Sequence, residues 1–180
     1  MRLNDLASET PAFDFRVFFE GRTRASGWFA DRFGRPRRHF RGDFVGRRDG
    51  AELVLDETLR YTDGVVEERL WRVSVDDDGR FRATGDALLG EASGRMRGNA
   101  LGMRYRMRVA VGGGRDVVFD FEDLMLLQPD GCLHNLVHVR KWGVRVGSVA
   151  TQYVRHARER ENEHGHPRER RSRRALGVAR

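Results

Sequence analysis

Apolar and polar residues alternate along most of this chain, in runs that short glycine-containing turns separate. The alternation is clearest over 99–111, where one face carries Leu101, Met103, Tyr105, Met107, Val109 and Val111 and the other carries Arg104, Arg106 and Arg108. A period of two residues is typical of β-strands with one buried face. The runs predict strands over 13–20, 23–30, 37–47, 51–61, 65–76, 80–87, 95–111, 115–128, 132–142 and 144–154, a bend or short extra strand over 88–94, and no amphipathic helix before residue 150.

The turns between these runs fall at nearly even spacing: Asp49-Gly50, Asp63-Gly64, Asp78-Gly79, Gly112-Gly113-Gly114 and Asp130-Gly131. Such turns are the strongest short-range signal for β-hairpins. Because a chain of hairpins must hide its edge strands, closure into a barrel is favoured. We therefore predict an all-β domain over residues 13–156, an antiparallel up-and-down meander barrel of eight to ten strands. Residues 1–12 form an N-terminal extension, and residues 157–180 a flexible, arginine-rich tail.

Hairpin loop lengths predict which residues face one another. A three-residue loop at 62–64 places Leu53, Leu55, Glu57 and Leu59 opposite Val73, Trp71, Arg69 and Glu67, with the apolar residues on one face. A two-residue loop there would set that face against Leu70, Arg72 and Ser74, because a one-residue slip exchanges the two faces. A two-residue loop at Asp49-Gly50 places Phe40, Gly42 and Phe44 opposite Leu59, Glu57 and Leu55. Three-residue loops at 77–79, 112–114 and 129–131 continue the pattern.

The predicted inner face also carries polar side chains, namely Glu57, Tyr61, Arg69, Asn99, Tyr105, Asp123, Asn135 and Lys141. A buried charge is costly unless it is paired or hydrated. Glu57 and Arg69 face each other and can pair, with Gly42 leaving room beside Glu57. They form either a structural ion pair or a polar patch that orients a ligand. Asp123 is either a general acid or base, or a carboxylate that bonds a neighbouring amide.

The formal net charge of the chain is +7. Residues 155–180 contain nine Arg and four Glu, a net charge of +5, so the rest of the chain carries +2. The segment from Arg168 to Arg174 has the composition that attracts nucleic acid or anionic lipid. A solubilising end in an arginine-rich proteome explains the same composition, because arginine codons are rich in G and C. The barrel itself lacks the aromatic platform of RNA-binding folds, and its tryptophans, Trp28, Trp71 and Trp142, are expected in the core or at the rim.

Other functional classes find no support in the sequence. The single cysteine, Cys132, excludes an intrachain disulfide. No signal peptide, lipidation site or transmembrane segment is evident. We therefore expect a cytoplasmic protein, with peripheral membrane contact as the alternative. His134 and His138 would lie about 13 Å apart on one strand, too far to share a zinc ion. No phosphate loop or nucleophile motif occurs. We expect no metal, no cofactor and no obligate partner.

Several short motifs together resemble one bacterial family. They are Phe19-x-Gly21, Gly27-x-Phe29-x-Asp31-Arg32-Phe33-Gly34, Leu55-x-Glu57, Tyr61-x-Asp63-Gly64, Arg69-x-Trp71-Arg72, Gly98-Asn99-Ala100 and Lys141-Trp142-Gly143. Over residues 13–155 the chain resembles the domain-of-unknown-function family number 3833, many members of which look like small lipoproteins. This chain departs from those members, because it shows no lipidated cysteine. The resemblance implies a lipocalin-like or calycin-like barrel and supplies no catalytic residue.

Three functions remain open. The first is non-enzymatic binding of a small amphipathic or lipid-like molecule inside the barrel, by a set of residues that comprises Glu57, Arg69, Trp71, Asn99, Tyr105, Asp123 and Asn135. The second is a cavity enzyme with Asp123 or Glu57 as acid or base and Arg69 or Lys141 stabilising an anion. The third is an interaction protein at an anionic membrane surface that acts through the tail. A filled interior would remove the first two, and an enclosed, unpaired carboxylate in a roomy interior would favour the enzyme.

Overall fold

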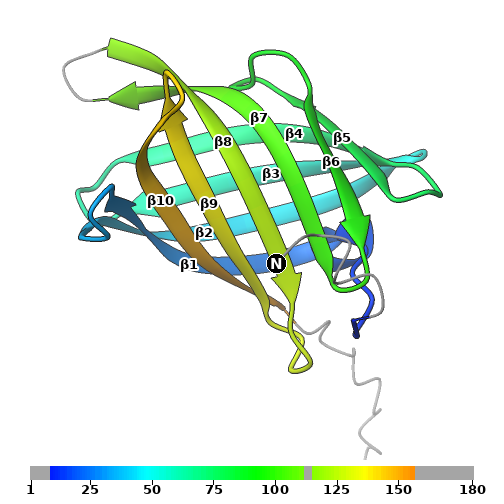
Figure 1. Cartoon of the computed structure of the whole chain (residues 1–180). Helices are drawn as coiled ribbons and strands as arrows, with labels where there is room; N and C mark the ends of the chain where they lie inside the picture. The colour runs from blue at the N-terminus through cyan, green and yellow to red at the C-terminus, as the bar shows by residue number, and fades with distance from the viewer. Residues whose placement is uncertain (1–8, 112–114, 157–180) are drawn as a thin grey trace, which may run out of the picture.

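The chain folds into a closed barrel of ten strands (Figure 1). The computed structural model describes residues 9–111 and 115–156. The strands are β1 (Gly21–Asp31), β2 (Pro36–Asp49), β3 (Glu52–Tyr61), β4 (Val66–Val75), β5 (Arg80–Gly85), β6 (Ala92–Arg97), β7 (Ala100–Val111), β8 (Arg115–Leu127), β9 (Leu133–Lys141) and β10 (Val144–Arg155). Each strand pairs antiparallel with its neighbours in sequence, and β1 pairs with β10. The predicted antiparallel meander barrel is confirmed.

The register of the β3–β4 hairpin is the predicted one. Leu53, Leu55, Glu57 and Leu59 lie opposite Val73, Trp71, Arg69 and Glu67. The predicted register between β2 and β3 is wrong by two residues, because the turn consists of Gly50 and Ala51, and Asp49 pairs with Glu52. Phe44 therefore lies opposite Glu57, and Gly42 lies opposite Leu59. An even shift leaves every side chain of β2 on its predicted face.

The predicted single strand over 95–111 is in fact two strands. Gly98 adopts a φ of 51°, and Arg97 pairs directly with Ala100 across the Gly98-Asn99 turn. Asparagine and glycine are the residues that tolerate the left-handed backbone of a two-residue hairpin turn. The bend or short strand expected over 88–94 supplies the beginning of β6 at Ala92.

The predicted strand over 13–20 is also wrong, because this segment contains the helix α1 (Phe15–Phe19). Asp14 caps it, and its Oδ1 accepts hydrogen bonds from the backbone NH groups of Arg16 (2.8 Å) and Val17 (3.4 Å). Phe15, Phe18 and Phe19 follow the spacing of one helix face, while alternate phenylalanines in the same stretch also fit a strand. Such a short apolar run satisfies both periods, and the cap decides between them.

The aromatic face of α1 closes one end of the barrel. The Phe19 ring lies 6.0 Å from that of Phe44 and 5.4 Å from that of Tyr153, and the Phe15 ring lies 5.2 Å from that of Phe81, measured between ring centroids. These rings belong to the main apolar cluster, which also holds the fully buried Leu53, Val73, Leu101 and Leu133. The β1–β2, β3–β4 and β9–β10 turns lie at the opposite end, which no helix of the described residues covers (Figure 1).

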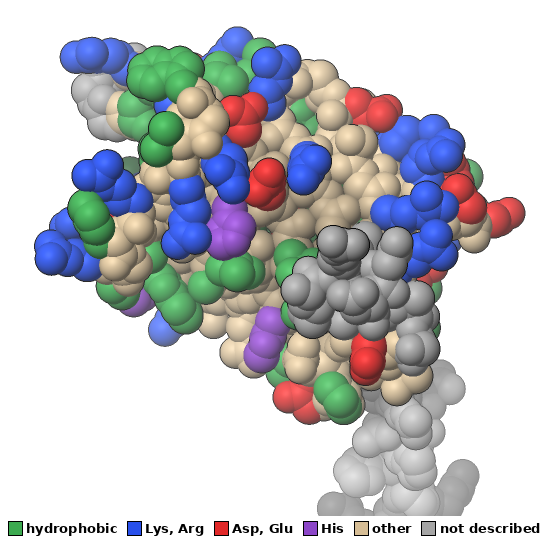
Figure 2. Space-filling view, in the orientation of Figure 1, with side chains coloured by type: hydrophobic (Ala, Val, Ile, Leu, Met, Phe, Trp, Pro, Cys, Tyr) green, Lys and Arg blue, Asp and Glu red, His purple; other side chains and the backbone are tan. Residues whose placement is uncertain are grey.

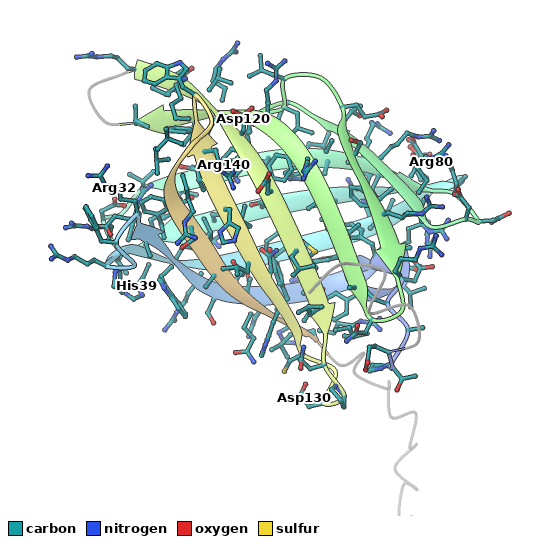
Figure 3. The ribbon with its side chains drawn as sticks, viewed as in Figure 1. Arg32, His39, Arg80, Asp120, Asp130 and Arg140 are labelled. Carbon is teal, nitrogen blue, oxygen red and sulfur yellow. The ribbon has the colours of Figure 1, made fainter. Side chains whose placement is uncertain are left out.

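The outer face of the barrel is charged. Figure 2 shows Arg, Asp and Glu side chains spread over it, and Figure 3 shows Asp120 and Arg140 there on neighbouring strands. Trp28 and Trp142 are exposed, so the prediction that the tryptophans are core or rim residues fails for Trp28, which lies on the outside of β1. In the described part of the chain, no helix has the length and apolar character needed to cross a bilayer.

Candidate functional site

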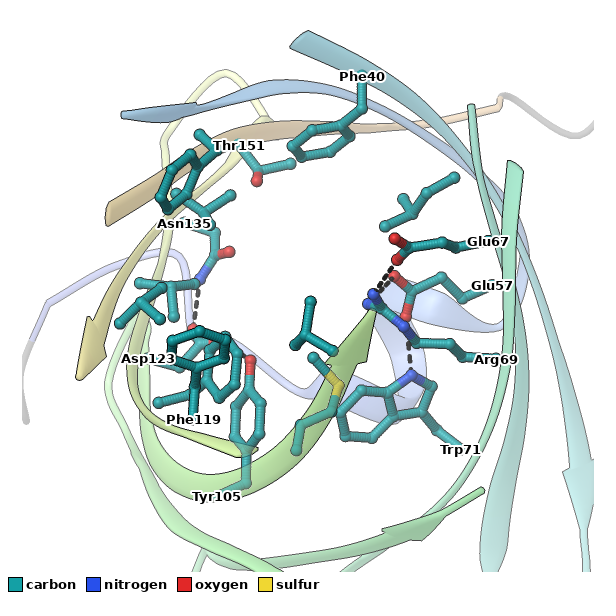
Figure 4. A pocket seen from close by; sticks show the side chains of 18 of the residues that line it. Phe40, Glu57, Glu67, Arg69, Trp71, Tyr105, Phe119, Asp123, Asn135 and Thr151 are labelled. Atoms are coloured by element: carbon teal, nitrogen blue, oxygen red, sulfur yellow. Dashed lines mark hydrogen bonds and ion pairs between the residues drawn. The ribbon is translucent and has the colours of Figure 1, made fainter. Parts of the chain in front are cut away.

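The barrel encloses a cavity of about 840 Å³. Its wall is mostly apolar and includes Phe29, Phe40, Leu59, Met107, Phe119 and Val139. Polar side chains interrupt this wall in two places, which Figure 4 shows on opposite sides of the space. One group lies on β3 and β4 around Arg69, and the other lies on β7, β8 and β9 around Asp123.

Arg69 holds two carboxylates in the first group. Its Nη1 lies 3.2 Å from Oε1 of Glu57, and its Nη2 also bonds Oε2 of Glu67. The indole Nε1 of Trp71 donates to Oε2 of Glu57 at 2.7 Å, and the Tyr61 hydroxyl donates to Oε2 of Glu67 at 3.1 Å. The strand register explains the arrangement, because Glu57, Arg69, Trp71 and Glu67 point inward from two paired strands.

The Arg69 guanidinium therefore pairs with the buried Glu57 and with the half-buried Glu67. Arg38 also approaches Glu67, at 3.9 Å. Burial raises the pKa of Glu57, although the Arg69 charge and the Trp71 hydrogen bond oppose that rise and the neighbouring Glu67 adds to it. Burial alone would lower the pKa of Arg69, but Glu57 and Glu67 together hold it above its ordinary value. Arg69 thus stays charged, and the pair of glutamates leaves this wall with more carboxylate than cation.

Asp123 forms the second group with two neutral donors. Its Oδ1 accepts a hydrogen bond from Nδ2 of Asn135, and its Oδ2 lies 3.3 Å from the Tyr105 hydroxyl. Only 6% of the Asp123 surface is exposed, and the described residues offer it no salt bridge. Burial raises the pKa of its carboxyl to about 7, against the opposing effect of the two hydrogen bonds. The side chain can therefore gain or lose a proton near neutral pH.

Aromatic rings surround this second group. The Tyr105 ring stacks on that of Phe121 with 4.9 Å between centroids and an angle of 5° between planes. The Trp71 ring meets Tyr105 edge to face at 5.8 Å, and so connects the two polar groups. Burial also raises the pKa of Tyr105, which keeps its hydroxyl protonated as a donor to Asp123.

Six of the seven predicted site residues are brought together by the barrel: Glu57, Arg69, Trp71, Tyr105, Asp123 and Asn135 all line the cavity. Asn99 does not line it. Its side-chain amide donates to the backbone oxygen of Leu127 at 3.1 Å in the turn between β6 and β7. Lys141 does not line it either, because its Nζ bonds the backbone oxygen of Val118 at 2.7 Å, close to the exposed Trp142.

Two polar contributors were not singled out from the sequence. Glu67 shares Arg69 with Glu57, and the correct β3–β4 register already placed it on the inner face. Arg38 lies at the mouth, where its guanidinium stacks 3.5 Å from the Tyr61 ring centroid and pairs with Asp63 at 2.7 Å. Its inward position follows from the alternation with Phe40, Gly42 and Phe44 along β2, which the two-residue error in register leaves unchanged.

The described residues contain no cluster of three or more His, Cys, Asp or Glu side chains that would hold a metal ion. His134 and His138 lie on the outer side of β9 and pair with different residues of β10. Their alternation with the buried Leu133, Asn135, Val137 and Val139 explains this placement.

Comparison with known proteins agrees with this architecture. No curated protein is detectably similar in sequence. Seven chains of solved structures are similar in fold, among them the S-type phycobiliprotein lyase CPES from Guillardia theta. The likeness to that lyase has a TM-score of 0.54 at 5% sequence identity and covers 77% of this chain and 88% of the lyase. It supports the lipocalin-like and calycin-like fold.

The family model described as "Protein of unknown function (DUF3833)" matches residues 1–155. This range takes in every strand of the barrel, α1 and both polar groups of the cavity. The earlier resemblance was carried by motifs that now have structural positions, such as Arg69-x-Trp71 in the cavity wall and Gly98-Asn99 in a hairpin turn. The chain belongs to the DUF3833 family of proteins of unknown function.

Proposed function

We propose that this protein binds a small amphipathic molecule, non-covalently, inside the barrel. The observation that carries the proposal is the cavity of about 840 Å³ with a mostly apolar wall and two convergent polar groups. Ligand sites in proteins have this size and this composition, because apolar walls supply affinity and a few polar groups fix orientation. The similar barrel of the S-type phycobiliprotein lyase is compatible with this use of the fold.

The shape of the barrel supports entry from one end. The aromatic side chains of α1 close the end near Phe81 and Tyr153, whereas the cavity wall continues to Val65, Val111 and Arg115 at the other end. A molecule that enters there passes Arg38 and Asp63 at the mouth. The groups around Arg69 and Asp123 face the molecule from opposite sides of the cavity (Figure 4). Removal of its apolar surface from water drives the binding.

Native mass spectrometry of the purified protein tests the proposal by showing any co-purifying ligand. Titration with the neutral fluorescent probe N-phenyl-1-naphthylamine gives a second readout. Val137→Phe and Leu136→Phe are matched variants on β9, since Val137 lines the cavity and Leu136 is 43% exposed on the outside. Val137→Phe should weaken probe binding and Leu136→Phe should not. Equal binding by both variants, or no binding by the natural protein, would contradict the proposal.

A second candidate function is a reaction on the bound molecule with Asp123 as acid or base. The observation that favours it is the enclosed Asp123 carboxyl, which has no ion-pair partner among the described residues and a pKa raised by burial to about 7. Such a group transfers protons readily at neutral pH. Incubation of the co-purified ligand with the natural protein and with Asp123→Asn distinguishes the two functions. A mass change that only the natural protein causes supports the enzyme, and an unchanged ligand in both supports binding alone.

A further inference from the structure

The polar groups of the cavity wall leave hydrogen-bond acceptors, more than donors, available to a ligand. Five side chains of the wall donate a hydrogen bond to a carboxylate: Tyr61 and Arg69 to Glu67, Arg69 and Trp71 to Glu57, and Tyr105 and Asn135 to Asp123. Each of these five side chains thus already directs a donor to an acid of the protein itself. Each carboxylate can accept about four hydrogen bonds, so the three acids still have free acceptor capacity.

Acidic groups also outnumber basic groups inside the cavity. Away from the mouth, the wall carries the three carboxylates Glu57, Glu67 and Asp123 against the single guanidinium of Arg69. At the mouth, Arg38 is paired with Asp63 and lies 3.9 Å from Glu67, and Arg115 is an exposed second cation. Arg69 makes ion pairs with both glutamates, so it is a poor receptor for the carboxylate or phosphate of an anionic lipid. A third acid on Arg69 would add repulsion in a site of low dielectric constant.

Asp123 is the carboxylate that a ligand can complement. Glu57 and Glu67 have Arg69, but Asp123 has only the neutral donors Asn135 and Tyr105. The stacked rings of Tyr105 and Phe121 lie beside it, with Trp71 against Tyr105. A carboxylate next to aromatic faces is the combination that binds ammonium groups, through an ion pair on one side and cation–π contact on the other.

We propose that the cavity is selective for amphipathic amines, with the ammonium group at Asp123 and the apolar part along the wall formed by residues such as Met107 and Val139. The inference rests on the proposed binding function, and it names the class of ligand. It also reverses the role suggested by the sequence for Arg69, which becomes a structural partner of two acids rather than the receptor of an anion.

Proton linkage gives the selectivity a pH dependence. The titratable groups that face Asp123 are Tyr105 on β7, Glu57 on β3 across the cavity and Tyr153 on β10, while β9 presents the non-titrating Asn135 and Val137. Burial raises the pKa values of both tyrosines well above the ordinary value, so they stay neutral. Glu57 is the other carboxyl with a raised pKa, so the contribution of Asp123 must be isolated by substitution.

Three ligands of equal chain length test the inference: dodecylamine, dodecanol and dodecanoate, each used to displace N-phenyl-1-naphthylamine below its micellar concentration. At about pH 8.5, where Asp123 is ionised and the amine still largely charged, dodecylamine should bind at least about tenfold more tightly than the other two. Asp123→Asn should abolish this preference and still bind dodecanol. Asp120→Asn, which changes an exposed acid on the outside of the same strand, should retain it.

The outcomes separate the two proposals. Binding of all three ligands with equal affinity would overturn the amine selectivity and leave the binding function intact. Failure of dodecanol and of the probe to bind would overturn the binding function itself. If Asp123→Asn does not fold, the natural protein still decides the matter: its preference for the amine over dodecanoate should fall severalfold between about pH 8.5 and pH 5.5, as Asp123 takes up a proton. A preference that stays constant would count against Asp123.

Discussion

The indole nitrogen of Trp71 lies 2.7 Å from Oε2 of Glu57, while Arg69 bonds the other oxygen of the same carboxylate. Both donors come from β4, two residues apart, and Glu57 comes from the paired strand β3. Glu57 is thus fixed from two sides in an apolar wall, and its ionised form depends on those two contacts. Arg69 in turn is held by Glu67, so loss of one member affects the whole group.

Arg69→Met should therefore destabilise the protein by about 3 kcal/mol, because it leaves the buried Glu57 carboxylate without a cation. It also leaves the half-buried Glu67 with the more distant Arg38, at 3.9 Å. The double variant Glu57→Gln and Arg69→Met should lose less, since glutamine still accepts the hydrogen bond from Trp71 and one buried charge is gone. Urea unfolding of both variants measures the difference. Small and equal losses would show that the group is hydrated and makes no net contribution.

The stability of the barrel should depend on pH through Asp123. Its pKa is 3.8 in the unfolded chain and about 7 in the folded one, because burial disfavours the charged form. Between these values the folded state holds a proton that the unfolded state has lost. The free energy of unfolding should then decrease as pH rises from about 4 to about 7, by up to about 4 kcal/mol, and remain level above that range.

Asp123→Asn removes this proton uptake and keeps the shape of the side chain. The variant should melt at nearly the same temperature as the natural protein at acidic pH and at a higher temperature at about pH 8. Asp120→Asn, on the exposed side of β8, should follow the natural protein throughout. Parallel melting curves for the natural protein and Asp123→Asn across this range would mean that Asp123 is hydrated in the folded state.

Close contact between α1 and β2 should make Gly46 intolerant of any side chain. A Cβ atom at this position would lie 1.9 Å from the backbone oxygen of Phe19. Gly46→Ala must therefore displace α1 from the end of the barrel, at a cost of about 1–3 kcal/mol by analogy with overpacked cores. Arg41→Ala, at an exposed position of the same strand, serves as the control in thermal unfolding. Equal melting temperatures would show that α1 is not tightly seated.

The alternation of residues predicted the barrel well because it is a local property that the whole sheet repeats. Each strand has one face inward, and hairpin turns with glycine leave few choices of pairing. The β2–β3 register was misjudged because Asp49-Gly50 and Gly50-Ala51 both form acceptable two-residue turns. The composition of the loop could not distinguish these two turns. The contact between α1 and Gly46 of β2 could not be predicted either, because it depends on how the helix packs against the barrel.

The candidate site was predictable as far as inward-facing positions determine it. Asp123 and Asn135 were identified by polarity on an apolar face, and the structure adds that they bond each other. Asn99 was misplaced because a turn interrupts the strand on which it was counted. The partition of Arg69 between two glutamates could not be predicted, because it depends on side-chain conformations rather than on register.

Residues 157–180 lie outside the described part of the chain, and their eight Arg and four Glu give them a net charge of +4. A chain that ends at His156 keeps every described strand pair, including the bond from the His156 amide to Arg22, so it should melt at the same temperature as the full chain. Its co-sedimentation with anionic vesicles and with DNA should decrease, and binding by the full chain should fall steeply with salt, because released counterions drive it. Unfolding of the shortened chain would mean that the tail packs on the barrel.

Retained binding would instead assign the basic site to one of two surfaces of the barrel. One carries the outward Arg104, Arg106 and Arg108. The other is the mouth, where Phe33 and Trp142 are 69% and 88% exposed near Arg32 and Lys141. Trp142→Ser in the shortened chain distinguishes these two surfaces, since only membrane contact at the mouth depends on that indole.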